Sequence, residues 1–135
     1  MLNTSNAPAQ GTEGDAILGA WLTEDGKAAV EIYRCDSEYC SSILWLKEPK
    51  NPDGTDVLDA KNPDPSKTNR KVLGLTMFWG FSYDGDRKWV GGSIYDPDNG
   101  KTYSCKMTLD NDTLKVRGFV GISLFGRTTV WKRKR

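Results

Sequence analysis

The carboxylates of one proline-rich stretch are the first residues in this sequence that could do chemistry. Four of them are close together in the chain: Asp53, Asp56, Asp59 and Asp64. Carboxylate oxygens are the ligands that Ca²⁺ prefers. Their spacing fits no compact calcium loop, however, and aspartate beside glycine and proline usually forms turns. We therefore expect no metal site here, and we expect Asp59, Asn62 and Arg70 to tie this stretch to the rest of the fold.

No other motif in the sequence indicates a metal site or a catalytic site. The segment 96–100 begins like a calcium loop, but Gly100 stands where a ligand is needed and Met107 occupies the twelfth position. The sequence contains no histidine, which removes Ser-His and Cys-His nucleophilic pairs and histidine zinc sites. No short motif selects two acids for glycoside hydrolysis. We nominate no catalytic residue and no cofactor, and we expect a protein that is not an enzyme.

The three cysteines carry information about compartment. Cys35 and Cys40 are close enough in sequence for a disulfide that closes the turn between two strands, whereas Cys105 is alone in a predicted strand. Such a disulfide favours an oxidising compartment, so we expect a periplasmic or secreted protein. Free surface thiols in a cytosolic protein are the alternative.

Composition limits the size of the fold and its partners. The chain of 135 residues is 37% hydrophobic, enough for one core, and its net charge of +1 provides no general field for nucleic acid. The basic run 132–135 is interpreted as a solvated chain end. No apolar run is long enough to span a membrane. Residues 1–14 are polar and lack an apolar signal core, so we expect a flexible leader there, any signal having been removed, and a single domain over 15–135.

Short segments rich in β-branched and aromatic residues, separated by turn residues, indicate eight strands. We place them at 17–23, 28–34, 41–47, 71–83, 88–95, 101–109, 113–121 and 127–132. The short connections favour sequential antiparallel hairpins, and closing the sheet removes its two edges. The sequence therefore predicts an all-β fold, a closed eight-stranded up-and-down antiparallel barrel. The one long connection, 48–70, contains four prolines and is predicted to be an irregular loop or lid.

Both ends of this barrel carry a signature. Gly19-Ala20-Trp21 opens the first strand, and an arginine-bearing strand, 126–133, closes the chain. This pattern resembles the lipocalin and fatty-acid-binding superfamily. The resemblance implies that Trp21 lies in the closed floor of the barrel with an arginine of the last strand over it. Antiparallel closure makes Arg133 the better-placed partner, with Arg127 second.

A closer resemblance covers nearly all of residues 15–133. It is to a bacterial family of small, usually exported proteins described only as a domain of unknown function. The matching motifs are Gly19-Ala20-Trp21-Leu22-Thr23, Val30-Glu31-Ile32-Tyr33, Cys40 before Trp45-Leu46-Lys47-Glu48-Pro49, Asp59 with Asn62-Pro63-Asp64, Gly74-Leu75, Gly92-Ser93-Ile94-Tyr95-Asp96-Pro97, Gly100-Lys101-Thr102-Tyr103, Val116-Arg117-Gly118 and Gly126-Arg127. The match implies a lipocalin-like (calycin-type) barrel outside the cytoplasm. The missing signal sequence and the extra Cys105 are departures from the pattern.

The aromatic content bears on function. Five Trp, five Tyr and four Phe could fill a small barrel or line a pocket within it. We expect a mainly apolar pocket, open at the end opposite Trp21 and bordered by the long loop, that binds a small hydrophobic or amphipathic, fatty acid-like ligand. Which strand parity faces inward is left open; the candidate lining residues are Val30, Ile32, Leu44, Leu46, Phe78, Trp89, Tyr95 and Arg127. Of these, Arg127 or Tyr95 would meet a carboxylate. The alternative is a solid-core structural or protein-interaction domain of the bacterial cell envelope. We expect a monomer or weak dimer and no nucleic-acid partner.

Overall fold

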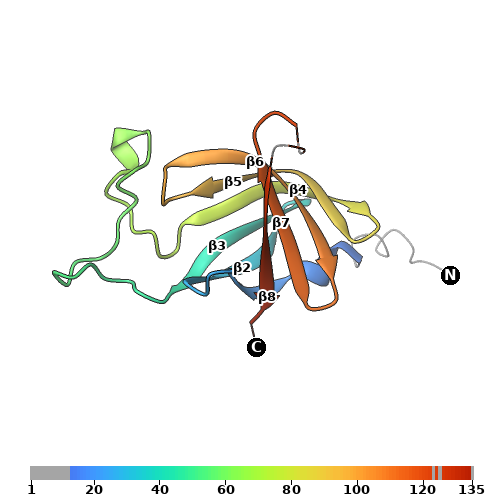
Figure 1. Ribbon diagram of the computed structural model, residues 1–135, viewed down its shortest axis with the longest axis horizontal. Coiled ribbons are helices and arrows are strands. Elements are labelled where there is room, and N and C mark those ends of the chain that lie inside the picture. Colours follow the sequence, from blue (N-terminus) through green and yellow to red (C-terminus); the bar gives the residue numbers. More distant parts are fainter. Residues whose placement is uncertain (1–12, 123, 125, 135) are drawn as a thin grey trace.

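The computed structural model describes residues 13–122, 124 and 126–134. Most of the predicted leader, residues 1–12, lies outside the described residues. The strands are β1 (Gly19–Leu22), β2 (Ala28–Cys35), β3 (Glu38–Leu46), β4 (Thr76–Gly85), β5 (Lys88–Asp96), β6 (Lys101–Asp110), β7 (Thr113–Phe119) and β8 (Arg127–Arg133). Each pairs antiparallel with the next, and β8 returns to β1, so the sheet closes into a barrel (Figure 1). The predicted all-β, eight-stranded up-and-down barrel is confirmed.

The barrel closes over a short stretch only. Strand β8 pairs with β1 at two positions, Trp21↔Arg133 and Leu22↔Lys132, but it pairs with β7 along its length, from Lys132 to Arg127. Beyond β1, the backbone amide of Val130 instead donates to the Glu24 carboxylate at 2.7 Å. This side chain supplies the acceptor that a neighbouring strand would otherwise provide, because β1 has ended at Leu22.

Two predicted strands begin later than expected, and β7 ends at Phe119 and not at 121. The segment before β1 is a 3-10 helix, η1 (Asp15–Ile17), and the strand begins only at Gly19, which has a φ of +115°. Strand β4 begins at Thr76 and not at 71, because Gly74 has a φ of +90° that breaks the extended run. Residues 71–75 therefore belong to the long loop, and the side chains of Val72 and Leu75 within it are buried.

Aromatic side chains fill the half of the barrel near Trp21. Trp21, Phe78, Phe81 and Trp89 are all fully buried, and the rings of Phe78 and Phe81 meet edge to face with centroids 4.9 Å apart. Both phenylalanines point inward although three positions separate them, because the β3–β4 register shifts between Tyr39↔Phe81 and Ser41↔Phe78. Gly80, with a φ of +81°, lies within this bulge.

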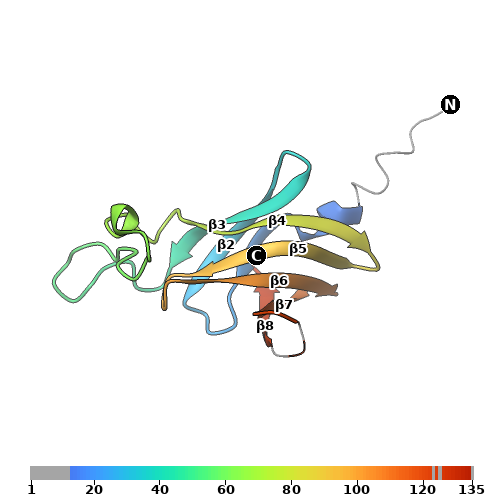
Figure 2. The same ribbon diagram turned by 90° about the horizontal axis from the view of Figure 1, so that it is seen from above.

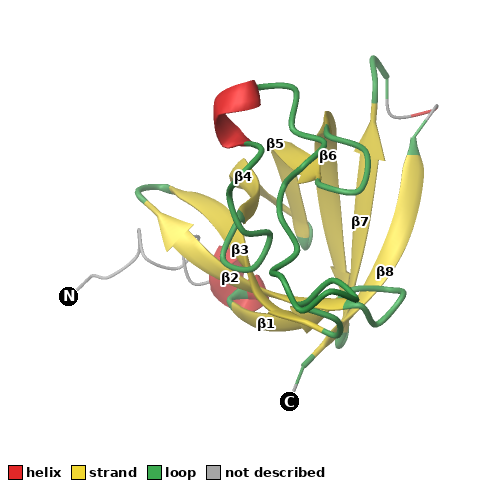
Figure 3. Cartoon of the chain, turned by 90° about the vertical axis from the view of Figure 1, so that its left-hand side faces the viewer, coloured by secondary structure: helices red, strands yellow, loops and turns green. Residues whose placement is uncertain are grey.

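The long loop between β3 and β4 lies at the other end of the barrel. It contains two isolated bridges, Lys50↔Asp56 and Leu58↔Lys71, and a short 3-10 helix, η2 (Pro65–Lys67). Figures 1 and 2 show it extending well beyond the strand ends, and in Figure 3 it passes in front of the barrel interior. The irregular loop expected from its prolines is therefore present, and it borders the end that η1 does not close.

Candidate ligand cavity

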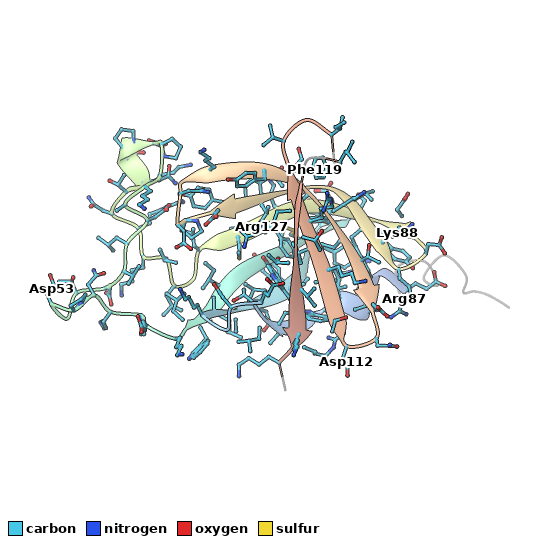
Figure 4. The ribbon with its side chains drawn as sticks, in the orientation of Figure 1. Asp53, Arg87, Lys88, Asp112, Phe119 and Arg127 are labelled. Carbon is cyan, nitrogen blue, oxygen red and sulfur yellow. A yellow bond between two sulfur atoms is a disulfide. The ribbon has the colours of Figure 1, made fainter. Side chains whose placement is uncertain are left out.

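A cavity of about 910 Å³ occupies the end of the barrel that faces the long loop. The β1–β2 turn, the β5–β6 turn, the start of β8 and the long loop surround its mouth. Figure 3 views the barrel from this end, and Figure 4 labels Arg127 at the start of β8. Its apolar walls come from five strands and the loop: Ile43, Leu46, Val57, Val72, Met77, Ile94, Val116, Phe119 and Trp131. The barrel is thus packed at one end and hollow at the other.

The packed end is sealed by Trp21 and Arg133. The Arg133 guanidinium lies over the indole of Trp21, 4.2 Å from the ring centroid. It also donates to the backbone oxygens of Leu18 at 3.1 Å and Ala16 at 2.7 Å. The indole N–H of Trp21 donates to the Ile17 carbonyl at 2.9 Å. These bonds hold η1 across the floor of the barrel, so the cavity opens away from Trp21.

A buried carboxylate joins the long loop to the barrel beside the cavity. Asp59 is completely buried and accepts three hydrogen bonds: from the Tyr95 hydroxyl at 2.6 Å, from Asn62 Nδ2 at 2.8 Å and from Arg70 Nη2 at 3.1 Å. Asn62 and Arg70 lie in the same loop, while Tyr95 lies at the end of β5 and lines the cavity. The cluster therefore has the role expected from sequence for Asp59, Asn62 and Arg70, with Tyr95 as the barrel-side partner.

The pKa values of this cluster follow from its contacts. Burial raises the pKa of Asp59, but the hydrogen bonds from Tyr95, Asn62 and Arg70 outweigh burial and hold that pKa below its usual range. Burial, together with the bond to Asp59, raises the pKa of Tyr95 to about 12. At neutral pH the carboxylate is charged and the phenol is neutral, so Tyr95 is the donor and Asp59 the acceptor.

The cavity mouth carries both signs of charge. Five acids and three bases line it: Glu24, Asp25, Glu48, Asp96 and Asp98 against Lys27, Lys47 and Arg127. Two of the acids accept hydrogen bonds from nearby backbone: Asp25 from the Lys27 amide and Asp96 from the Asp98 amide. Arg127 is at the edge of β8, exposed to solvent and in reach of the cavity.

The candidate residues named from sequence divide into three groups. Leu46, Tyr95 and Arg127 line the cavity. Val30, Ile32, Phe78 and Trp89 point inward, but they are buried in the core near the floor and do not line it. Leu44, also named as a candidate lining residue, does not line the cavity and is 50% exposed. Ile43 is buried, so alternation turns Leu44 outward. Val30 pairs with Ile43 and Ala29 with Trp45, so Leu44 is the extra residue of a β-bulge, and after this bulge Leu46 faces the cavity.

Sequence reasoning missed most of the cavity wall on β7 and β8. Val116 and Gly118 of β7 line the cavity, as do Thr129, which pairs with Val116, and Trp131 of β8. A signal for them exists. Trp131 is two positions from Arg133 and therefore faces the same side of β8. The pairing of β7 with β8 puts Val116 and Gly118 on that same side of the sheet.

The calcium-like segment 96–100 is a turn. The Gly100 amide donates to the Asp96 carbonyl at 2.8 Å, and a side chain at Gly100 would collide with the carbonyl of Lys61 in the long loop. Glycine is required there for close packing, not for ion binding. Across the described ranges, no group of three or more acids or cysteines could hold a metal ion.

Cys35 and Cys40 form the disulfide that the sequence predicted. It closes the β2–β3 turn with its Cα atoms 6.0 Å apart, and Asp36 between them has a φ of +58°. Cys105 is a free, buried thiol, and burial raises its pKa to about 12. It is therefore not a reactive thiolate at neutral pH.

Comparisons with known proteins agree with this architecture. A bacterial family described as "Uncharacterized protein conserved in bacteria (DUF2147)" matches residues 19–133. The solved structure of HP1028 from the human pathogen Helicobacter pylori, a protein reported to belong to the lipocalin family, superposes with a TM-score of 0.76 at 22% sequence identity. The alignment covers 88% of this chain and 83% of that one. Among curated proteins, none matches the sequence. Within the described residues, no helix is long and apolar enough to cross a membrane.

Proposed function

The chain belongs to that bacterial family, DUF2147, and we propose that its barrel binds a small apolar or amphipathic molecule of the fatty acid type in the cavity at its open end. The observation that carries the proposal is the cavity itself, whose volume of about 910 Å³ is in the range of small-molecule sites. A barrel that served only as a structural or interaction domain would have no need of a hollow end.

The lining supports an acyl chain as the buried part of the ligand. Ile94, Val116 and Trp131 form adjoining parts of the wall, and each buried CH₂ group contributes about 0.8 kcal/mol. Five or six methylenes would offset much of the cost of association. We propose that Arg127, one of three bases at the mouth, meets a carboxylate of the ligand, since the hydroxyl of Tyr95 is already bonded to Asp59.

The compartment in which the protein acts is part of the proposal. A disulfide between Cys35 and Cys40 persists in an oxidising environment and is rare in the cytosol. We infer that the protein acts in the periplasm or outside the cell, as a monomer or weak dimer that carries or senses its ligand without performing a reaction.

The test is a titration with a fluorescent fatty acid, followed through quenching of Trp131 and the other tryptophans. Gly118 lines the cavity, and a Cβ added there meets Tyr103 and Ile94 only at ordinary contact distances of 3.6 and 3.8 Å. The backbone at Gly118 therefore accepts a Cβ, and Gly118→Leu adds a bulky side chain at the cavity wall. We expect saturable binding to the parent protein and binding at least about tenfold weaker to Gly118→Leu.

Lys115→Leu is the matched control, because Lys115 is exposed on the outer face of the same strand. Unchanged binding by this variant, with loss in Gly118→Leu, supports the cavity as the site. No saturable quenching at micromolar ligand, or equal loss in both variants, would contradict the proposal and leave the interaction-domain function in its place.

A further inference from the structure

The connection between β7 and β8 exposes aliphatic side chains to solvent. Val120 is 72% exposed, Ile122 57% and Leu124 74%. Among the large hydrophobic residues of the described chain, Val120 and Leu124 are the two most exposed. The sequence from 119 to 126 contains no charged residue. Soluble proteins seldom gather apolar side chains at the tip of one loop unless something covers them.

This loop projects from the barrel and is held at its base. Figures 1 and 2 show it extending past the end of β7, on a different side of the barrel from the long loop. Arg117 donates to Thr128 Oγ1 at 2.7 Å and to the Leu124 carbonyl at 3.4 Å. Gly126 packs so closely on the Gly118 carbonyl and Phe119 that a side chain there would clash. The base is thereby fixed, and the apolar side chains are presented outward.

The loop is also one wall of the cavity mouth. Phe119 and Val120 line the cavity, and so does Arg127, the first residue of β8. Figure 4 labels Phe119 and Arg127, which mark the two ends of the loop. Whatever covers the loop tip therefore lies beside the entrance to the cavity.

We propose that the β7–β8 loop docks the barrel mouth on a phospholipid bilayer by inserting Val120, Ile122 and Leu124 among the lipid acyl chains. Arg117 and Arg127 at the base of the loop would then lie at the level of the lipid phosphates, where a guanidinium interacts favourably. Insertion of apolar side chains, and not a general field, drives this docking, since the net charge of the chain is only +1.

A bilayer fits this surface better than a protein partner does. A stable protein interface takes about 20 to 30 residues from each side, whereas this patch consists of three aliphatic side chains on a protruding tip. Its aliphatic composition also lacks the exposed Trp and Tyr that anchor protein interfaces. A bilayer needs neither a large nor a flat surface, because it accommodates the tip.

Docking would place the cavity mouth against the membrane, where an amphipathic ligand could enter without crossing water. This last consequence rests on the proposed function, whereas the docking itself does not. The two are therefore tested separately.

The docking test is co-sedimentation of the full chain with vesicles of phosphatidylcholine and phosphatidylglycerol at 3:1, and with vesicles of phosphatidylcholine alone. We expect comparable binding to both, because apolar insertion drives the docking and the cavity mouth carries five acids against three bases. The double variant Ile122→Asp, Leu124→Asp should reduce partitioning at least about tenfold, because charged side chains do not enter the acyl region. The matched control is Tyr33→Asp, Leu44→Asp, which places two acids at apolar positions on the outer barrel wall that are 38% and 50% exposed.

The proposal is overturned if the parent protein sediments with neither vesicle, or if the control variant loses as much binding as the loop variant. It is also overturned if the parent does not bind vesicles but forms a dimer in analytical ultracentrifugation that the loop variant lacks, since the occupant is then a second copy. Thermal melts check that both variants fold. Fatty acid titration without vesicles should be unchanged in the loop variant; vesicle binding without fatty acid binding would refute the proposed function alone.

Discussion

The hydroxyl of Tyr95 donates a 2.6 Å hydrogen bond to Oδ1 of Asp59, which joins the end of β5 to the long loop at the cavity mouth. The backbone bonds beside this pair, Asp59 N to Arg70 O and Val72 N to Val57 O, are internal to the loop, and the backbone bonds between loop residues 74 and 75 and Ile43 of β3 lie at the end of the loop. The buried carboxylate therefore supplies a polar link between the middle of the loop and the barrel.

We predict that Asp59→Asn loosens the loop and leaves the barrel folded. An amide cannot accept all three donors, so the cost is that of unsatisfied buried polar groups, about 1–3 kcal/mol. Hydrogen exchange should rise in residues 57–72 and stay unchanged in β6 and β7. Asp53→Asn is the control, because Asp53 is exposed at the loop tip, where it bonds to Thr55. Equal exchange in the parent and Asp59→Asn would show that the cluster does not hold the loop.

The same carboxylate predicts a dependence of stability on pH. The pKa of Asp59 is lower in the folded protein than its ordinary value, so its contribution is present above about pH 4 and is lost as the pH falls through the folded-state pKa. The free energy of unfolding, measured in urea from pH 7 down to pH 3, should therefore fall. The free energy of unfolding of Asp59→Asn should fall less steeply over the same pH range. Parallel curves for the two proteins would contradict this assignment.

The sequence was sufficient for the fold because its signals are local. The strands, the turn residues between them and the Trp21 and Arg133 signature each constrain one hairpin or the closure, and the closed barrel follows from their agreement. Parity within the barrel was harder to predict. A single extra residue at Leu44, and the bulge at Gly80, reverse which face the following residues occupy.

The cavity wall was predicted least well for the same reason. Tyr95 and Leu46 line the cavity, but Val30 and Trp89, which also point inward, lie deeper in the packed core. Position along a strand, not only its face, decides between wall and core. Sequence alternation reports the face and carries no information about depth until the register is known.

We predict that Trp21→Ala destabilises the protein by about 3–5 kcal/mol, because a completely buried indole is replaced by a cavity. Arg133→Met should cost about 1–3 kcal/mol, since it retains apolar contact with the ring but removes the cation and its bonds to Ala16 and Leu18. Lys132→Met is the control, because Lys132 is the exposed neighbour on β8. Denaturant unfolding measures all three, and equal midpoints for Arg133→Met and Lys132→Met would show that the guanidinium does not seal the floor.

The last prediction concerns the thiols. When the oxidised protein is unfolded in denaturant, one thiol per chain should react with a thiol reagent. This thiol is that of Cys105, because Cys35 and Cys40 are joined. In the folded protein this thiol should react slowly, since it is buried and its pKa is raised to about 12. Reducing the disulfide should cost about 2 kcal/mol, a small value because the loop that it closes is short. Cys105→Ala should lower the count in denaturant to zero. A count of three thiols in the oxidised parent, or a thiol remaining in Cys105→Ala, would mean that Cys35 and Cys40 are not joined. The proposed location outside the cytoplasm would then lose the support of the disulfide.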